Sequence, residues 1–283
     1  MKIGFIGAGK VGCSFGKYLK ESGLSISGYY SRNYENAVFA SDYTESVCFG
    51  DFYSLAENSD IIFITVKDSV ISEIWDGLPY DKLKGKLVCH CSGALSSDVF
   101  QKASDRGIFV CSVHPMLAVS GKDDAFKNFA KAFFTVEGNS YACSEIKKIL
   151  EGIGNNVKII ENSQKKSLYH LACVFQSNLI NALIYMGSEF LKECGFDERE
   201  AILASSPLVY GNLDNVFKKG VQGALTGPVE RCDISTIQKH IGILKDEDAY
   251  IYKTLSSKLV DIAMVKNPDV SYDKLKKILE VSK

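Results

Sequence analysis

The sequence predicts an α/β fold, with an N-terminal, doubly wound Rossmann domain around a mostly parallel sheet and an all-α C-terminal domain. Three observations lead to this prediction. Glycines stand at G-x-G-x-x-G spacing directly after an apolar run. Short apolar runs then alternate with helix-like stretches, and later only helix-like stretches follow. We therefore expect a dinucleotide-binding domain over residues 1–160 and a helical substrate and dimerisation domain over residues 161–283.

The predicted strands are short and almost continuously apolar, which is typical of strands that helices cover on both faces. They lie at residues 2–6, 25–30, 61–66, 87–91, 108–113, 133–137 and 157–160. The predicted helices between them lie at residues 11–22, 34–40, 70–76, 97–106 and 144–153. This alternation favours a parallel sheet.

The second half of the chain has the pattern of helices throughout. One long helix is expected at residues 163–194, with Gly195 as its stop. Further helices are expected at residues 198–212, 234–244, 248–266 and 272–281.

Composition indicates a cytoplasmic globular protein. The chain has 283 residues and a net charge of −1, with 46% hydrophobic and 24% charged residues. Such a balance does not favour nucleic acid or an anionic membrane as a partner. We find no apolar run of about 18 residues and no signal-peptide pattern, so we expect no membrane span. Nine scattered cysteines without a C-x-x-C pair predict buried free thiols and no metal site.

The glycine motif predicts the cofactor site. Gly7 permits a tight turn, Gly9 lets the backbone approach a pyrophosphate, and Gly12 lets the following helix lie close to the sheet. The N–H groups at the start of that helix can bind phosphates. We expect cofactor contacts from the whole loop, which comprises Gly7, Ala8, Gly9, Lys10, Val11 and Gly12.

The end of the second strand indicates which nucleotide binds. NAD sites usually have an acidic residue about 20 positions beyond the glycines, where it binds the ribose 2′-hydroxyl. Here Ser31 and Arg32 stand at that place, and the first acid is Glu35. Because a guanidinium pairs well with a 2′-phosphate, we expect NADP(H) as the cofactor, bound by Ser31 and Arg32. The alternative is that Arg32 is simply a solvated surface residue.

Further candidates follow other strands, at the edge of the sheet where ligands bind. Val66 and Lys67 follow the strand at 61–66 and are expected to contact the cofactor. Ser92 and His114 follow the next two strands and are expected to bind the substrate. A structural hydrogen bond is an equal alternative for His114.

A polar stripe runs along the long helix. Lys166, His170, Cys173 and Ser177 lie within about 60° of one another around its axis, and Asn178 flanks them. His170, Lys166 and Asn178 are the catalytic candidates, and Ser177 is expected to bind substrate. Imidazole titrates near neutral pH, which suits a proton donor. Polar packing between helices or subunits is the alternative.

A Gly-Pro turn in the segment LTGPVERCD adds one more candidate. Thr226 is a compact polar group beside this turn, and we expect it to bind substrate. Asp233 can cap the helix that follows.

Together these motifs resemble a family of bacterial NADP-binding oxidoreductase-like proteins with a Rossmann domain and a C-terminal helical domain of unknown function. The matching segments are GFIGAGKVG, YYSR, HCSG, SVHPM, KKSLYHLACVFQSN and LTGPVERCD. Cys232 stands where that family usually has glycine. The resemblance implies NADP and a homodimer formed through the helical domains.

The wider superfamily is similar to 6-phosphogluconate and β-hydroxyacid dehydrogenases, ketopantoate reductase, pyrroline-5-carboxylate reductase and deazaflavin-dependent NADP reductase. Its dehydrogenases have a Lys that transfers a proton and an Asn, four residues later, that orients substrate. The resemblance places Lys166 and His170 at those positions, with His in place of Asn.

We therefore expect an NADP(H)-dependent oxidoreductase that transfers a hydride to or from a small carbonyl or imine substrate. The second hypothesis is a non-catalytic NADP(H)-binding regulator or sensor, because the Lys/Asn pair is substituted. A third is reduction of a flavin or deazaflavin.

Overall fold

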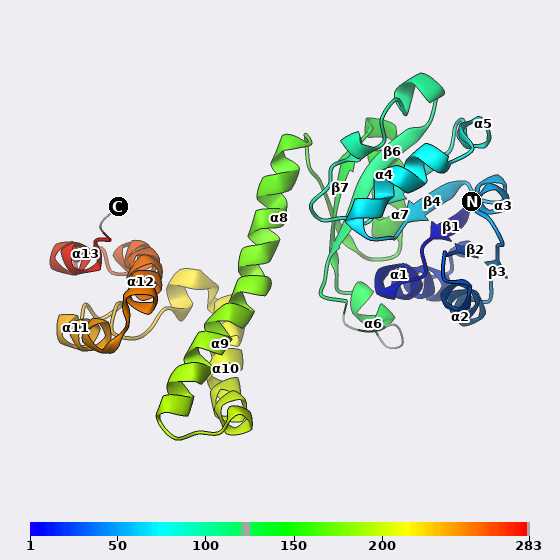
Figure 1. The fold of residues 1–283 in the computed structure, drawn as a ribbon. Helices are drawn as coiled ribbons and strands as arrows, with labels where there is room; N and C mark the ends of the chain where they lie inside the picture. Colours follow the sequence, from blue (N-terminus) through cyan, green and yellow to red (C-terminus); the bar gives the residue numbers. More distant parts are fainter. Residues whose placement is uncertain (120, 122–124, 282–283) are drawn as a thin grey trace. The chain divides into compact units, whose positions relative to one another are not determined.

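Eight strands form one sheet with the order β3-β2-β1-β4-β5-β6-β7-β8 in the computed structural model, which describes residues 1–119, 121 and 125–281 (Figure 1). The strands are β1 (Lys2–Ile6), β2 (Ser25–Tyr30), β3 (Val47–Cys48), β4 (Ile61–Ile64), β5 (Leu87–His90), β6 (Phe109–Met116), β7 (Phe133–Gly138) and β8 (Asn156–Ile159). The first six run parallel, β7 pairs antiparallel to β6, and β8 runs parallel to β7. The predicted Rossmann sheet, mostly parallel, is therefore confirmed.

Helices of the first part connect these strands. They are α1 (Lys10–Glu21), α2 (Tyr34–Thr44), α3 (Phe52–Glu57), α4 (Asp68–Gly77), α5 (Tyr80–Leu83), α6 (Phe126–Phe129), α7 (Ser140–Gly152) and α8 (Gln164–Gln176). The helix predicted at 97–106 is wrong: two short 3-10 helices, η1 (Ser97–Val99) and η2 (Ser104–Arg106), stand there. Strand β3 and helices α3, α5 and α6 were not predicted, because such short elements carry no periodic signal.

Two hydrophobic cores lie on the two faces of the sheet. In β4, Ile61 and Phe63 belong to the core beneath α1, α2 and α7, whereas Ile62 and Ile64 belong to the core beneath α3 and α4. Side chains on a strand alternate between faces, so a strand buried on both sides must be apolar at every position. This explains the unbroken apolar runs in the sequence.

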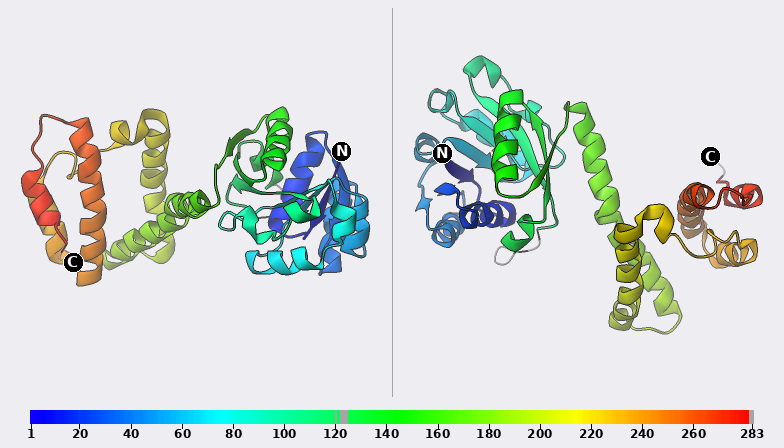
Figure 2. Two further views of the ribbon diagram at one scale, coloured as in Figure 1. Left: turned by 90° about the horizontal axis from the view of Figure 1, so that it is seen from above. Right: turned by 180° about the vertical axis from the view of Figure 1, so that it is seen from behind.

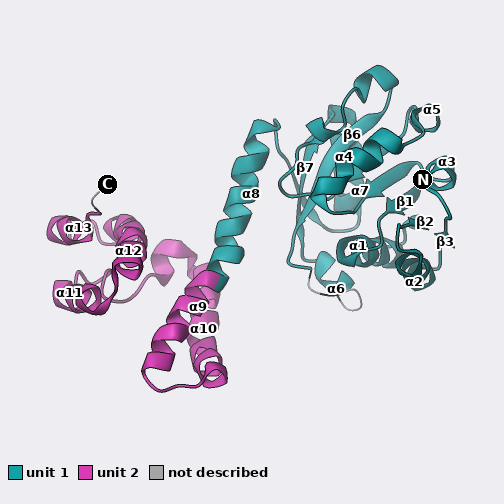
Figure 3. Ribbon diagram, in the orientation of Figure 1, with its two compact units in different colours: residues 1–181 teal, residues 182–283 magenta. Residues whose placement is uncertain are grey.

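The chain divides into two compact units, Met1–Asn181 and Ala182–Lys283 (Figure 3). The division falls later than residue 160, where the sequence predicted it. Helix α8 accounts for the difference, because Lys166 and Tyr169 of this helix hydrogen-bond to Ser112 and His114 of β6.

Among its described residues the second unit contains helices joined by turns and no strand, as predicted (Figure 2). It contains most of α9 (Asn178–Glu193), then α10 (Glu198–Ala224), α11 (Ile234–Ile243), α12 (Asp246–Lys266) and α13 (Asp273–Leu279). Helix α12 contacts α10, α11 and α13. The core of this unit is built around Ile237, Val260 and Leu275.

Two predicted helices have different lengths in the structure. The helix predicted at 163–194 is two helices, because Ser177 leaves the helical conformation with φ −131° and ψ −75°. Helix α10 was expected to end at residue 212 but extends to Ala224, with Pro207 in its interior and a kink at Gly220, where φ is 74°.

Helices α8 and α9 are unusually apolar on the outside. The stretch Gln164–Glu193 contains an 18-residue window of mean hydropathy 1.2, of which 6% is buried. By length and composition alone this stretch could cross a membrane. The sequence prediction of no membrane span rested on the lack of a continuous apolar run.

Candidate cofactor and substrate site

The first and third glycines of the motif are required by close packing. Gly7 has φ +107°, and a Cβ there would lie 2.8 Å from the carbonyl oxygen of Thr65. A Cβ on Gly12 would overlap Thr65 Oγ1 and the carbonyl oxygen of Gly7. The Thr65 hydroxyl donates to that same carbonyl at 2.7 Å. These contacts hold the start of α1 against the ends of β1 and β4.

The presence of glycine at position 9, in the middle of the motif, has a different explanation. A Cβ on Gly9 would meet nothing within 4 Å, so packing does not require glycine there. Gly9 is the N-cap of α1, no side chain caps this helix, and its first turn contains no acid. The open backbone and the free N–H groups therefore fit a phosphate group. In the same loop, Ala8 is buried and Lys10 is exposed.

The predicted 2′-phosphate residues follow β2, next to the glycine loop in the sheet order. Ser31 is half-buried and Arg32 is exposed. Asn33 caps α2, because its Oδ1 accepts from the Asn36 N–H at 3.1 Å. Arg32 thus remains as the cationic side chain at this strand end, where it can pair with a phosphate.

Residues after β4 complete this edge. Val66 is half-buried against the core beneath α4, and Lys67 is an exposed N-cap without a side-chain bond. Parallel strands bring their carboxyl ends to one edge, and the order β2-β1-β4-β5-β6 aligns the loops that follow them. The edge therefore runs from Arg32 through the glycine loop to His114.

A pocket of about 290 Å³ opens at the far end of this edge, within the first unit. It is lined by His114, Met116, Leu117, Ala118, His170, Cys173, Gln176, Ser177 and Asn178. The structure therefore brings together four sequence-predicted residues: His114, His170, Ser177 and Asn178. Of the polar stripe of the long helix, His170, Cys173 and Ser177 line this pocket.

Two histidines converge on one glycine beside the pocket. A Cβ on Gly93 would lie 2.8 Å from His114 Nε2 and 2.9 Å from His170 Nδ1, so only glycine fits there. His170 Nδ1 is buried and has no hydrogen-bond partner among the described residues. The Tyr169 hydroxyl lies 2.6 Å from His114 Nδ1. When His114 accepts from Tyr169, its Nε2 carries the ring hydrogen and faces Gly93.

His114 is held neutral. Burial lowers its pKa from 6.5 to about 4, and the charges of Lys166, His170 and His90 act in the same direction. Burial raises the pKa of the Tyr169 phenol. Both members of the pair are therefore uncharged at neutral pH, and the short bond between them needs no counter-ion.

Ser92 has a structural role in this structure. Its hydroxyl donates to Asp68 Oδ2 at 2.7 Å and accepts from the N–H groups of Ala94 at 3.1 Å and Leu95 at 2.9 Å. A hydroxyl has one hydrogen and two lone pairs, so these three bonds use its full capacity. Ser92 thus fixes the turn after β5, and the side chain does not line the pocket.

Lys166 lies beneath the pocket rather than in its wall. Its side chain is 1% exposed and its ammonium donates to Ser112 Oγ at 3.0 Å. Burial lowers the pKa of Lys166, and the carboxylate of Glu137 acts against this. The ammonium therefore does not line the pocket, and its hydrogen-bond partner is Ser112 of β6.

Thr226, the remaining predicted residue, belongs to the second unit. It is exposed in the turn between α10 and α11 and does not line the pocket described above. Asp233 caps α11 as predicted, because its Oδ1 accepts from the Thr236 N–H at 3.1 Å. Cys232 stands where the resemblance led us to expect glycine, and its φ of 54° is a left-handed conformation that favours glycine.

Sequence reasoning missed three residues of this site: Tyr169, Ser112 and Glu137. A usable signal existed for two of them, because Ser112 and Glu137 are polar residues inside otherwise apolar strands. Both are buried. Tyr169 carried no such signal, since tyrosine on a helix is usually a packing residue.

His90 is a structural histidine. Its Nε2 donates to the Ser96 carbonyl at 3.1 Å, and its Nδ1 accepts from the Ser92 N–H at 3.2 Å. Burial lowers its pKa from 6.5 to about 4. All nine cysteines are free thiols, and no group of His, Cys, Asp or Glu within the described ranges could hold a metal ion.

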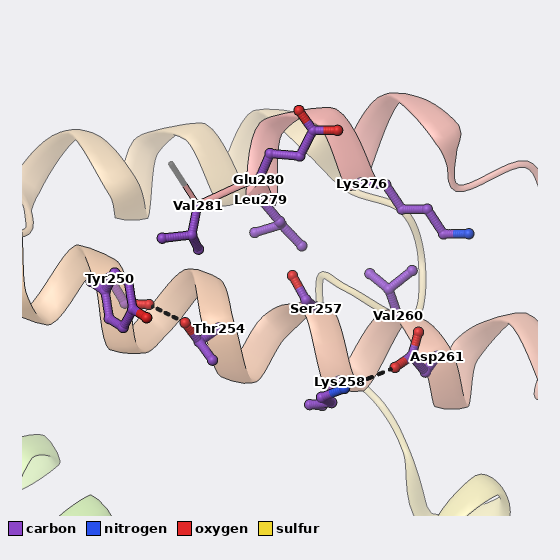
Figure 4. Close-up of a pocket in the computed structure, with 10 residues that line it drawn as sticks. All are labelled: Tyr250, Thr254, Ser257, Lys258, Val260, Asp261, Lys276, Leu279, Glu280 and Val281. Atoms are coloured by element: carbon purple, nitrogen blue, oxygen red, sulfur yellow. Dashed lines mark hydrogen bonds and ion pairs between the residues drawn. The ribbon is translucent and has the colours of Figure 1, made fainter. Parts of the chain in front are cut away.

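A cavity of about 410 Å³ lies between α12 and the end of α13 in the second unit (Figure 4). Some of its polar groups are bound locally: the hydroxyl of Thr254 donates to the Tyr250 carbonyl at 2.8 Å, and Lys258 pairs with Asp261 at 3.6 Å. Among the described residues, none of the buried side-chain atoms without a hydrogen-bond partner belongs to the lining of this cavity.

Two family models match the chain. Residues 2–93 match the NADP oxidoreductases described as coenzyme F420-dependent, and residues 132–259 match a domain of unknown function, DUF2520. This confirms the resemblance drawn from the sequence motifs, and it confirms NADP as the cofactor of the matching family. No curated protein matches the sequence.

Solved structures share the fold over nearly the whole chain. A protein of Thermotoga maritima has 27% identity and a TM-score of 0.74, with 94% of this chain and 99% of that one covered. An imine reductase from a Pseudomonas species has 16% identity and a TM-score of 0.62, covering 93% and 97%. A pyrroline-5-carboxylate reductase from Coxiella burnetii has 15% identity and a TM-score of 0.63, covering 99% and 98%.

Proposed function

We propose that this chain, which joins an NADP oxidoreductase domain at its N-terminus to a C-terminal domain of unknown function, is an NADPH-dependent reductase of a small carbonyl or imine compound. The observation that carries the proposal is the pocket that contains His114 and His170. It lies at the same sheet edge as the glycine loop that fits a pyrophosphate. When bound, NADPH supplies a hydride.

The chain's own residues would bind the substrate and supply a proton. Reduction of a C=O or C=N group leaves an oxygen or nitrogen that must gain a proton. His170 suits this role, because its Nδ1 is unpartnered at the pocket. Neutral His114 suits a hydrogen bond to the polar atom of the substrate. Ser177 and Asn178 line the pocket and would orient the substrate.

Two of the similar solved structures suggest C=N compounds as the first substrates to test. One is an imine reductase, and pyrroline-5-carboxylate is itself a cyclic imine. At 16% and 15% identity they share the fold with this chain, so they guide only the order in which substrates are tested. A small pocket of about 290 Å³ suits a compound of a few heavy atoms beside the nicotinamide.

A non-catalytic NADP(H)-binding regulator is the second candidate. It is favoured by one observation: Lys166, which the resemblance matches to the proton-transfer lysine of the dehydrogenases, is buried and bound to Ser112 and does not line the pocket. Such a protein would need the glycine loop and Arg32 but no proton donor.

The deciding experiment follows NADPH absorbance in the presence of cyclic imines, ketone and amine mixtures, keto acids and flavins. We expect oxidation of NADPH with at least one carbonyl or imine. Turnover with flavins alone would favour the third hypothesis, and no turnover with tight NADPH binding would favour the regulator. Replacing His170 by Ala should lower kcat about 100-fold or more without changing NADPH affinity.

We also propose that the protein is a homodimer through the helical part. The apolar face of α8 and α9 is exposed at Leu168, Leu171, Phe175, Leu179 and Leu183. The opposite, polar face of α8 is bound to the sheet by Lys166 and Tyr169, so this helix does not have the all-round apolar surface of a membrane span. A second copy presents the same stripe, which suits a two-fold symmetric contact.

A further inference from the structure

Two oppositely charged side chains are buried together next to β6, the strand that carries His114 of the pocket. Glu137 of β7 is 3% exposed and Lys166 of α8 is 1% exposed. The hydroxyl of Ser112 on β6 lies between them, 3.2 Å from Glu137 Oε2 and 3.0 Å from Lys166 Nζ. Burying a charge costs several kcal/mol unless a counter-charge and hydrogen bonds compensate it. An arrangement of this kind therefore needs a reason.

The hydrogen bonds in this group have one consistent direction. The ammonium donates to Ser112 Oγ, and the single hydrogen of that hydroxyl is then available for Glu137. The carboxylate also accepts from Ser97, from its N–H at 2.8 Å and from its hydroxyl at 2.8 Å. Every neighbour donates toward Glu137, which suits an ionised carboxylate. The chain of bonds ends at Lys166 with a positive charge.

The antiparallel pairing of β7 with β6 determines where the Glu137 carboxylate lies. Strand β7 runs antiparallel to β6, and Ser112 is paired directly with Glu137. Directly opposed residues on antiparallel strands share a face and lie close together. The departure from a fully parallel sheet thus puts a carboxylate beside Ser112 of β6.

We propose that Glu137 is a positioning residue for Lys166: acting through Ser112, it holds a charged ammonium against β6, the strand that carries His114 of the substrate pocket. The catalytic consequence of this arrangement rests on the proposed reductase function. The arrangement itself does not, because it concerns groups that are all present in the chain.

Glu137 is the counter-charge in this environment. The titratable groups around Lys166 come from four elements or their ends: His90 and Cys91 at β5, Cys111 and His114 on β6, Glu137 on β7, and Tyr169 and Cys173 on α8. Glu137 is the one carboxylate among these groups. Burial raises the pKa of Cys91 to about 12, so that thiol does not supply a negative charge at neutral pH.

The proposal differs from a purely structural role in one measurable way. If Glu137 were neutral and only fastened α8 to the sheet through hydrogen bonds, its replacement by Gln would lower stability and leave the titration of Lys166 nearly unchanged. If Glu137 keeps the ammonium charged, removal of the Glu137 carboxylate lowers the pKa of Lys166, because the carboxylate no longer offsets the effect of burial.

The test is an NMR titration of the full-length protein with ¹³C-labelled lysine, in which Lys166→Met identifies the Lys166 signal. We expect the titration midpoint of Lys166 to fall by about one pH unit or more in Glu137→Gln. Glu137→Asp should restore part of the shift. Ser112→Ala should also lower the midpoint, whereas Ser112→Thr, which keeps the hydroxyl, should not. An unchanged midpoint in a folded Glu137→Gln protein would overturn the proposal.

A second measurement decides the matter if Glu137→Gln does not fold. The double variant Glu137→Gln/Lys166→Met removes both charges, so it should regain folding and NADPH binding, because no uncompensated ammonium remains. If the double variant also fails to fold, the three residues form a structural unit and the proposal is wrong. Neither measurement uses a substrate, so failure of the reductase proposal would be seen separately, as absence of turnover.

Discussion

The hydroxyl of Tyr169 lies 2.6 Å from Nδ1 of His114, and this bond joins the first helix after the sheet to the end of β6. Together with the bond from Lys166 to Ser112, it turns the polar face of α8 toward the sheet. The apolar face of the same helix then faces outward. One pair of hydrogen bonds therefore explains two features: a polar pocket on one side of α8 and an exposed apolar stripe on the other.

The fit of Gly93 between two histidines gives the first prediction. Replacing Gly93 by Ala places a methyl group 2.8 Å from His114 Nε2 and 2.9 Å from His170 Nδ1, so the rings must move. We expect a loss of about 1–3 kcal/mol in the free energy of unfolding and a fall in turnover. Gly152→Ala is a matched control, because a Cβ at this helical position meets nothing within 4 Å. Equal behaviour of the two variants would contradict the packing argument.

Neutral buried histidines predict a pH dependence of stability. Burial lowers the pKa of both His90 and His114 from 6.5 to about 4. Between these values the unfolded chain binds protons that the folded chain does not, so stability rises with pH there. We expect the free energy of unfolding to fall as the pH drops from about 6.5 to about 4. Urea unfolding at several pH values should show a smaller slope in His114→Gln; an identical slope would exclude His114 as a cause.

Much of the first unit was predictable because its signals are local. Alternating apolar runs and the glycine spacing predict the strands, the sheet class and the loop at Gly9, and each depends on neighbouring residues only. The antiparallel turn of β7 was not predicted, since strand direction depends on pairing with a distant strand, as Ser112 pairs with Glu137. The polar groups that such pairing buries can be predicted only when the register of the two strands is known.

Part of the candidate site was also predictable from local signals. Helical periodicity placed His170 and Ser177 on one face with Asn178 flanking them, and the structure brings all three to one pocket. Helical periodicity did not reveal that Lys166 would be buried and absent from the pocket lining, because the burial of a side chain depends on how α8 packs against β6. Cys232 shows the reverse case: the resemblance led us to expect glycine at this position, and the left-handed φ of 54° is a conformation that favours glycine.

The different roles of two glycines in the cofactor loop give a third prediction. Gly9→Ala should leave the melting temperature nearly unchanged, because its methyl group enters open space, but it should weaken NADPH binding about tenfold or more by blocking the approach to the pyrophosphate. Gly12→Ala should instead lower stability, because its methyl group overlaps Thr65. Calorimetry of both variants checks this, and a stability loss in Gly9→Ala would contradict it.

The place of Arg32 after β2 predicts the choice between the two nicotinamide cofactors. Removal of a guanidinium that binds a 2′-phosphate costs about 1.5–3 kcal/mol, which corresponds to a roughly 10- to 100-fold weaker NADPH affinity. We expect this loss in Arg32→Ala, measured by fluorescence titration. Affinity for NADH, which lacks the phosphate, serves as the internal control and should stay constant. A parallel loss for both cofactors would show that Arg32 does not read the phosphate.

The apolar stripe of α8 predicts how the protein associates. Phe175 is 58% exposed and lies in the middle of the stripe, so a charge there should split a dimer without disturbing the sheet. We expect Phe175→Glu to change the mass measured by light scattering from that of two chains to that of one. Tyr53→Glu is the control, because Tyr53 is similarly exposed, at 54%, but lies on α3. A wild-type protein that is monomeric, or one that binds lipid vesicles through this stripe, would show that the stripe has a different partner, since a second copy would otherwise cover it.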